Sequence, residues 1–222
     1  MRGEGGARPV SLHLPDLAAA ILAGGRASRY GGAPKGMLVL PDGRTIVERT
    51  IAETRAAGLE QVALIANDPG PYVDLGVPII PDQRPGSGPL GGIEAALAHF
   101  AARRGVLVLP CDLPGIGRAE IAALLSGFGA AGRSGAPVVA QGPDGFWHPL
   151  CAVVPSALLP AVRRAIDEGR LGVYRLWRAL EAVPVRFERD TPFFNVNEPE
   201  DLERWLLAEA LPSGRRAHSQ PA

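Results

Sequence analysis

The alternation of short, almost wholly apolar runs with longer amphipathic segments leaves few folds open to this chain. A run without polar positions is typical of a strand buried on both faces, as in a parallel sheet covered by helices. The expected strands are 18–23, 61–66, 77–80, 105–110, 136–140, 150–154 and 183–187. The expected helices are 45–57, 91–104, 118–125, 156–168, 173–180 and 199–211. We therefore predict an α/β fold with a mainly parallel sheet and helices on both faces.

The domain organisation is expected to be simple, because the 222 residues contain no internal repeat and no convincing domain boundary. A single domain is predicted for residues 17–211. Residues 1–16 and 212–222 are expected to be flexible tails. The first tail lacks the apolar centre of a secretory signal, and no apolar run reaches the length of a membrane span. The expected location is the cytoplasm.

Charge and cysteine content argue against several classes of function. The 23 Lys and Arg residues balance the 23 Asp and Glu residues, so the formal net charge is zero. Broad electrostatic binding of nucleic acid or of an anionic membrane is therefore not expected. Cys111 and Cys151 lie in separate apolar runs without a C-x-x-C pair, which favours buried, reduced thiols over a structural zinc site.

A glycine-rich basic loop follows the first expected strand. It runs from Leu22 to Lys35 with the sequence LAGGRASRYGGAPK. Glycines let backbone N–H groups approach phosphate oxygens, and Arg26, Arg29 and Lys35 add the positive charge that a triphosphate requires. The loop matches neither the P-loop nor the dinucleotide-binding fingerprint. Taken alone, it could also be a mobile surface loop with solvated arginines.

Two aspartates follow later apolar runs, at the strand ends where α/β sheets bind their ligands. Asp112 follows 105–110, where a carboxylate can hold Mg²⁺ against substrate phosphates. Asp82 follows 77–80 and precedes the glycine-rich segment 86–92, which is expected to open a helix at Gly91–Gly92 and to offer N–H groups to an anion. The alternatives are a turn or capping aspartate and a flexible helix entry.

Two amides near the end of the chain, Asn195 and Asn197, share a face if their segment is extended. Amides can ligate a hard metal or hydrogen-bond a heteroaromatic ring. The alternative for Asn197 is that it caps the last helix.

Together these motifs resemble the molybdenum cofactor guanylyltransferases, over residues of about 18 to 207. The resemblance rests on their order: LAGGxxSRxGGxxK at 22–35, GPLGG at 88–92, PCDxP at 110–114, HP at 148–149 and NxNxPED at 195–201. It implies a Rossmann-like three-layer nucleotidyltransferase fold. The implied reaction transfers GMP from GTP to the terminal phosphate of Mo-molybdopterin, which releases pyrophosphate and forms the molybdopterin guanine dinucleotide. The implied cofactor is Mg²⁺.

The resemblance also implies roles for individual residues. Contacts to guanine and ribose are implied for Leu22, Ala23 and Gly24, with room for the base at Gly25. Lys35 is placed on the phosphates, Asp82 in the nucleotide pocket and Asp112 on Mg²⁺. Asn195 and Asn197 are placed at the pterin or the metal. Ile65 stands where some members carry a base-contacting asparagine, although Asn67 is two residues further on and would point to the same side of a strand.

The expected mechanism needs charge neutralisation more than a general base, because a substrate phosphate is already deprotonated near neutral pH. Arg29 and Lys35 are expected to neutralise charge that moves onto the leaving pyrophosphate, and Asp112 to hold the metal. The predicted catalytic residues are therefore Lys35, Asp112 and Arg29.

Two rival functions are open. The first is a cytidylyltransferase that acts on molybdopterin or on a sugar or polyol phosphate; Gly24–Gly25 favours guanine over it. The second is a nucleotide-binding protein without turnover, against which Lys35 and Asp112 argue. By resemblance, molybdoenzymes or other cofactor-assembly proteins are expected partners beside GTP and Mo-molybdopterin.

Overall fold

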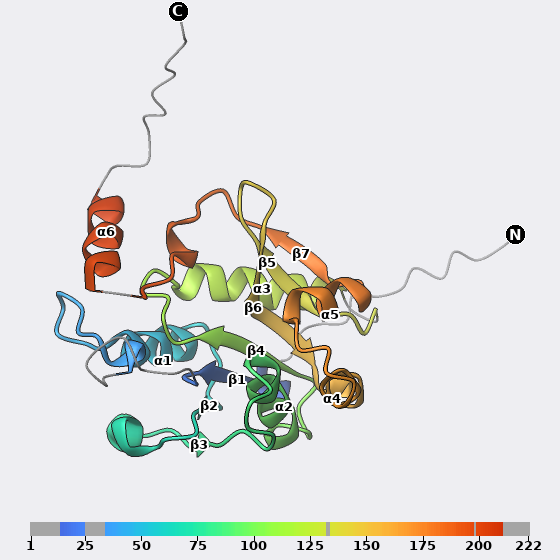
Figure 1. Cartoon of the computed structure of the whole chain (residues 1–222). Coiled ribbons are helices and arrows are strands. Elements are labelled where there is room, and N and C mark those ends of the chain that lie inside the picture. Colours follow the sequence, from blue (N-terminus) through green and yellow to red (C-terminus); the bar gives the residue numbers. More distant parts are fainter. Residues whose placement is uncertain (1–13, 25–33, 132–133, 198, 211–222) are drawn as a thin grey trace, which may run out of the picture.

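The computed structural model describes residues 14–24, 34–131, 134–197 and 199–210. Within these ranges, the strands form one sheet in the order β3–β2–β1–β4–β6–β5–β7 (Figure 1). The strands are β1 (Leu17–Leu22), β2 (Val62–Ile65), β3 (Ile79–Ile80), β4 (Gly105–Pro110), β5 (Val138–Gln141), β6 (Trp147–Pro155) and β7 (Val183–Arg186). Every predicted strand is present; β4 has the predicted bounds, and the ends of the other strands differ from the prediction by at most three residues.

The sheet is mainly parallel, as predicted. β1 lies between β2 and β4 and is parallel to both, and the pairs β2–β3 and β5–β7 are also parallel. The exception is β6, which is antiparallel to β4 and to β5. The reason is the connection between β5 and β6, residues 142–146, which is too short for the crossover that parallel strands need.

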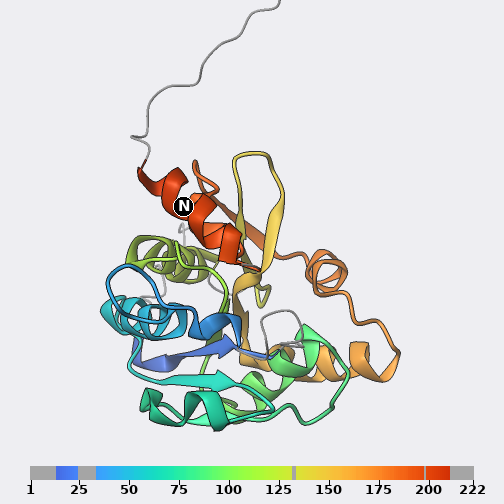
Figure 2. The same ribbon diagram turned by 60° about the vertical axis from the view of Figure 1, so that its left-hand side comes forward.

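Helices cover both faces, so the predicted three-layer Rossmann-like fold is confirmed (Figures 1 and 2). One face packs on α1 (Ile46–Ala56) and α3 (Arg118–Ala131), and the other on α2 (Pro89–His99), α4 (Leu159–Asp167) and α5 (Val173–Ala179). Alternate residues of β1 enter the two cores, because successive side chains of a strand point to opposite faces. All six residues of β1 are buried. The last helix, α6 (Pro199–Ala210), packs through Trp205 on a small separate cluster with Leu40, Ile46 and Val196.

Helix α2 differs from its predicted range 91–104. It begins at Pro89, a residue favoured in the first turn, after Gly88 with φ of +58°. Gly91 and Gly92 therefore lie inside the helix and do not form its entry loop. The helix ends at His99, and the N–H of Arg104 donates instead to the carbonyl of Asp16.

Only a small part of the predicted tails lies within the described residues. Residues 1–13 and 211–222 lie outside the described residues. Leu14–Asp16 form a short 3-10 helix, and Leu14 packs against the core beneath α1 and α3. Among the helices of the described part, none is long and apolar enough to cross a membrane.

Candidate active site

A cavity of about 890 Å³ opens at the carboxyl ends of β1, β2 and β4, where an α/β sheet of this kind binds ligands. Its size is in the range of small-molecule sites. Leu22, Ala23 and Gly24 line it after β1, and Ala66 and Asn67 line it after β2. Lys35, Asp82 and Asp112 supply its charged groups together with Asp68.

Most residues predicted for the site thus lie around one cavity. The predicted residues that line it are Leu22, Ala23, Gly24, Lys35, Asp82 and Asp112. Asn195 and Asn197 do not line it, but each contacts one of its charged residues. Gly25 and Arg29 lie outside the described residues.

Asp112 comes directly after β4 and is held from two sides. Its Oδ2 accepts a hydrogen bond from the Asn195 side chain at 3.3 Å, and its carbonyl accepts one from the N–H of Val196 at 2.9 Å. Its other carboxylate oxygen, Oδ1, is buried without a hydrogen-bond partner among the described residues. Burial raises the pKa of Asp112, while the charge of Lys35 and the Asn195 contact lower it. A buried carboxylate oxygen without a donor is the arrangement expected of a cation ligand.

Lys35 lines the same cavity as Asp112 and is fixed by the second amide. Its Nζ donates to Oδ1 of Asn197 at 2.5 Å. Val196 between the two amides is fully buried, so Asn195 and Asn197 point to the same side, as predicted for an extended segment. Among the described residues, Oδ1 of Asn197 accepts from Lys35, and α6 begins two residues later at Pro199. A segment from the end of the chain therefore closes the site over both Asp112 and Lys35.

The residue after Lys35 shows why the loop can approach β4 so closely. Gly36 is buried, and a Cβ placed there would lie 3.1 Å from Cβ of Cys111, the neighbour of Asp112. Only glycine fits this contact without a shift of the chain. Lys35 is thereby brought to the end of β4 although the two segments are far apart in sequence.

Asp82 is paired with a residue that follows β2. The N–H of Asp82 donates to Oδ1 of Asn67 at 2.8 Å, and Nδ2 of Asn67 donates to Oδ2 of Asp82 at 3.1 Å. Ile65 is buried in the core beneath α2. The polar group that follows β2 in the cavity is therefore Asn67, whose side chain ties the β2 and β3 ends together.

Glycine lets α2 approach the end of β1 beside the cavity. A Cβ placed at Gly92 would lie 3.1 Å from Cδ2 of Leu22. Gly88 and Pro89, at the start of α2, line the cavity. The positive end of the helix dipole thus faces a space in which an anion is favoured.

Tyr72 is a cavity residue that the sequence pattern did not indicate. It belongs to a 3-10 helix (Gly70–Leu75) and is almost fully buried. Its hydroxyl has no hydrogen-bond partner among the described residues, and burial raises its pKa. A tyrosine in a loop between two strands carries no motif, so only the fold could place it here.

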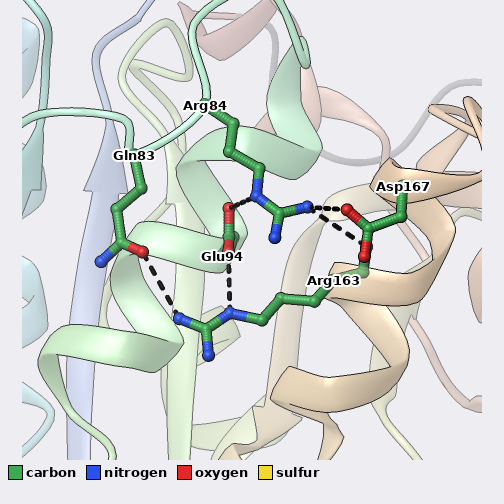
Figure 3. A network of polar contacts seen from close by, with 5 residues as sticks. All are labelled: Gln83, Arg84, Glu94, Arg163 and Asp167. Atoms are coloured by element: carbon green, nitrogen blue, oxygen red, sulfur yellow. Dashed lines mark hydrogen bonds and ion pairs between the residues drawn. The ribbon is translucent and has the colours of Figure 1, made fainter.

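A buried carboxylate anchors the segment between Asp82 and α2 (Figure 3). The side chain of Glu94, in α2, is 1% exposed and accepts from Nε of Arg163 at 2.8 Å. Nε of Arg84 lies 3.5 Å from its other oxygen, and Arg84 also reaches Asp167 at 2.6 Å. Nη2 of Arg163 donates to Gln83 at 3.4 Å. The network joins α2 and α4 to the chain that follows Asp82.

We expect Glu94→Ala to lower the free energy of unfolding by about 2 kcal/mol, since a hydrogen bond to a charged group contributes roughly 1.5–3 kcal/mol. The loss is not larger because both arginines are partly exposed and can reach water. Urea unfolding measures it. Asp167→Asn is the matched control: Asp167 is 64% exposed, so its ion pair should contribute less than about 1 kcal/mol. If both variants lose the same free energy of unfolding, burial of Glu94 does not make its ion pairs more stabilising than the exposed pair of Asp167.

Comparison with known proteins agrees with this architecture. The family model of the MobA-like NTP transferase domain matches residues 19–184. A molybdenum cofactor guanylyltransferase from Acidiphilium cryptum (strain JF-5) is 38% identical over 194 residues, which cover 84% of this chain and 92% of that protein.

Two solved structures share the fold at lower identity. One is molybdopterin-guanine dinucleotide biosynthesis protein A from Archaeoglobus fulgidus, with a TM-score of 0.65, 24% identity and coverage of 87% of this chain and all of that one (100%). The other is Rv0371C from Mycobacterium tuberculosis H37Rv in complex with manganese, with a TM-score of 0.64, 21% identity and coverage of 86% and 97%.

Proposed function

The chain belongs to the MobA-like NTP transferase family, and from this premise we propose that it transfers GMP from GTP to the terminal phosphate of Mo-molybdopterin. The products are pyrophosphate and the molybdopterin guanine dinucleotide. One observation carries the proposal: Lys35 and Asp112, which come from distant segments, face one cavity and are each held by an amide of the same terminal segment. This pairing supplies a fixed cation and a candidate metal ligand for the phosphate charge of the reaction.

The geometry supports a displacement at the α-phosphorus of GTP. An oxygen of the acceptor phosphate forms the new bond, the bond to the β-phosphate oxygen breaks, and pyrophosphate leaves. The difficulty lies in bringing two anions together and in neutralising the leaving group. Lys35 offers a fixed ammonium group for this charge, and we assign Arg29 to the same side. No proton needs to be removed from the acceptor phosphate.

We propose Mg²⁺ as the cofactor. The fit rests on Oδ1 of Asp112, which is buried without a donor, and on the neighbouring Asn195 amide. The described residues contain no cluster of three or more His, Cys, Asp or Glu side chains that could hold a metal. A site with one carboxylate is typical of Mg²⁺, which takes its other ligands from substrate phosphates and water. When bound, the ion would offset phosphate charge. The manganese complex of the Mycobacterium tuberculosis protein is consistent with a divalent ion.

We assign the base and ribose to Leu22, Ala23, Gly24 and Gly25, and Asp82 to the same pocket. Asn67 holds Asp82 in place by two hydrogen bonds. The pair Gly24–Gly25 is our reason for guanine over cytosine. We also expect the protein to work in the cytoplasm and to pass its product to molybdoenzymes or other cofactor-assembly proteins.

Nucleotide choice can be measured by thermal unfolding in Mg²⁺ with GTP, CTP or ATP. A ligand at a hundred times its Kd stabilises the folded state by about 2.7 kcal/mol. For a chain of this length that corresponds to a rise in Tm of roughly 5–10 °C. We expect GTP to give the largest rise. A larger rise with CTP would favour the cytidylyltransferase alternative and would refute the role given to Gly24–Gly25.

A further inference from the structure

A cluster of two aromatic rings and an arginine lies outside the residues assigned so far. Trp147 begins β6, and Tyr174 and Arg178 lie one turn apart on α5. The rings of Trp147 and Tyr174 meet edge to face, with centroids 5.5 Å apart. The guanidinium carbon of Arg178 lies 5.2 Å from the centroid of the Trp147 ring. We call these three residues the aromatic shelf.

The aromatic shelf lies next to the cavity. Leu150 of β6 lines the cavity, and the pairing of Val108 with Ala152 places Leu150 beside Pro110, another lining residue. Trp147 is three residues further out along the same strand, beyond an irregularity in its pairing with β5, where Val139 pairs with Ala152 but Ala140 with His148. Leu150 and Trp147 both pack against the core beneath α2, α4 and α5, so both lie on one face of the sheet. The shelf therefore extends the cavity on the side away from β2 and β3.

The position of α5 is fixed, yet its outer face remains free. Trp177 is fully buried, and its Nε1 donates to the carbonyl of Pro149 at 2.8 Å. Tyr174 and Arg178 are exposed on the other side of the helix. Among the described residues, Arg178 has no carboxylate partner. A rigid platform thus presents a phenol ring and an uncompensated guanidinium to solvent.

We propose that the aromatic shelf binds the planar fused heterocycle of the acceptor substrate. The proposal rests on the transfer reaction proposed above. Arginine and aromatic planes stack on heteroaromatic rings, and a guanidinium also attracts an acceptor that carries negative charge. We assign guanine to the residues that follow β1, on the other side of β4 from the aromatic shelf on β6. The guanine ring and the acceptor heterocycle would therefore occupy opposite ends of the cavity. The acceptor phosphate then lies between them, near Lys35 and Asp112.

The test compares KM values in pyrophosphate release, with Mo-molybdopterin as acceptor and GTP as donor. Arg178→Gln and Trp147→Ala should each raise the acceptor KM at least about fivefold, because each variant removes a group on which the heterocycle would stack. The KM for GTP should stay within about twofold. Trp147→Phe keeps a ring and should recover most of the loss. Phe146→Ala is the matched control, because Phe146 is 74% exposed and makes no ring contact with the shelf.

Two results would overturn the inference, and they are distinct. If the wild type turns over but the acceptor KM is unchanged in both Arg178→Gln and Trp147→Ala, the heterocycle binds elsewhere and the proposed reaction stands. If the wild type binds GTP but releases no pyrophosphate with the acceptor, the proposed reaction fails and the inference fails with it. Arg178→Gln changes an exposed side chain, so loss of folding cannot account for its effect; a GTP thermal shift on each variant confirms an intact nucleotide site.

Discussion

Asp112→Asn should lower kcat about a thousandfold or more while the protein stays folded. The substitution keeps the shape of the side chain but removes the charge that we assign to the metal. Neutralisation of phosphate charge by a metal contributes several kcal/mol to the transition state, and each 1.36 kcal/mol is a factor of ten in rate. Stability should not fall, because the native carboxylate has one buried oxygen without a donor. The measurement is pyrophosphate release at saturating GTP, with Tm recorded in parallel.

Asp74→Asn is the control for this variant. Asp74 lies in the 3-10 helix that carries Tyr72, is exposed, and does not line the cavity. Its replacement should leave kcat within about twofold. A wild-type rate in Asp112→Asn would refute the metal role. A large fall in Tm would instead show that Asp112 acts through the fold.

Lys35→Ala should lower kcat by about 10²–10³, the usual loss when one preorganised donor to developing negative charge is removed. Lys35 is the only lysine in the chain, which otherwise uses arginine for its positive charge. Lys35→Arg should not restore the rate, because the broad planar guanidinium cannot replace a compact ammonium group 2.5 Å from Asn197.

The hydrogen bond between Lys35 and Asn197 allows a double-variant experiment that tests whether the two side chains act together. If Asn197 acts by holding Lys35, the losses in Lys35→Ala and Asn197→Ala will not add in the double variant. Additive losses would show that the two side chains act separately. A chemical measurement is also open: an amine-directed acylating reagent can modify only Lys35 and the N-terminus, and GTP should protect Lys35. Equal labelling with and without GTP would remove Lys35 from the phosphate site.

The strands, and the residues at their ends, could be predicted because a strand that is buried on both faces appears in the sequence as a continuous apolar run. The buried runs of β1 and β4 indicate Asp112 and the glycine-rich segment that begins at Gly24, since ligands bind at the carboxyl ends of such strands, whereas the roles of Leu22 and Ala23 are implied by the family resemblance. An apolar run does not indicate the direction of its strand. The antiparallel direction of β6 follows from the short connection 142–146 and not from its apolar pattern.

The start of α2 is predicted at Gly91 but lies at Pro89. The difference arises because glycine occurs both in flexible loops and inside helices that pack closely against a neighbour. The sequence pattern predicts a helix entry at Gly91 and Gly92, but both lie inside the helix, where the absence of a Cβ at Gly92 allows close contact with Leu22. Pro89 was the better signal for the first turn. The Lys35–Asn197 contact spans 162 positions in the sequence, and pairings at that distance follow from topology. The places of Tyr72 and of the aromatic shelf beside the cavity likewise follow from the topology of the fold and not from a local sequence motif.

The central claim is that this site moves GMP onto a phosphate and does not merely bind GTP. The most direct measurement uses GTP labelled at its α-phosphorus, together with Mg²⁺ and Mo-molybdopterin. We expect the label to appear in the dinucleotide product, with one pyrophosphate released per label transferred, and Asp112→Asn to suppress both. Tight binding of GTP without transfer of the label would contradict the account and identify the protein as a nucleotide-binding regulator.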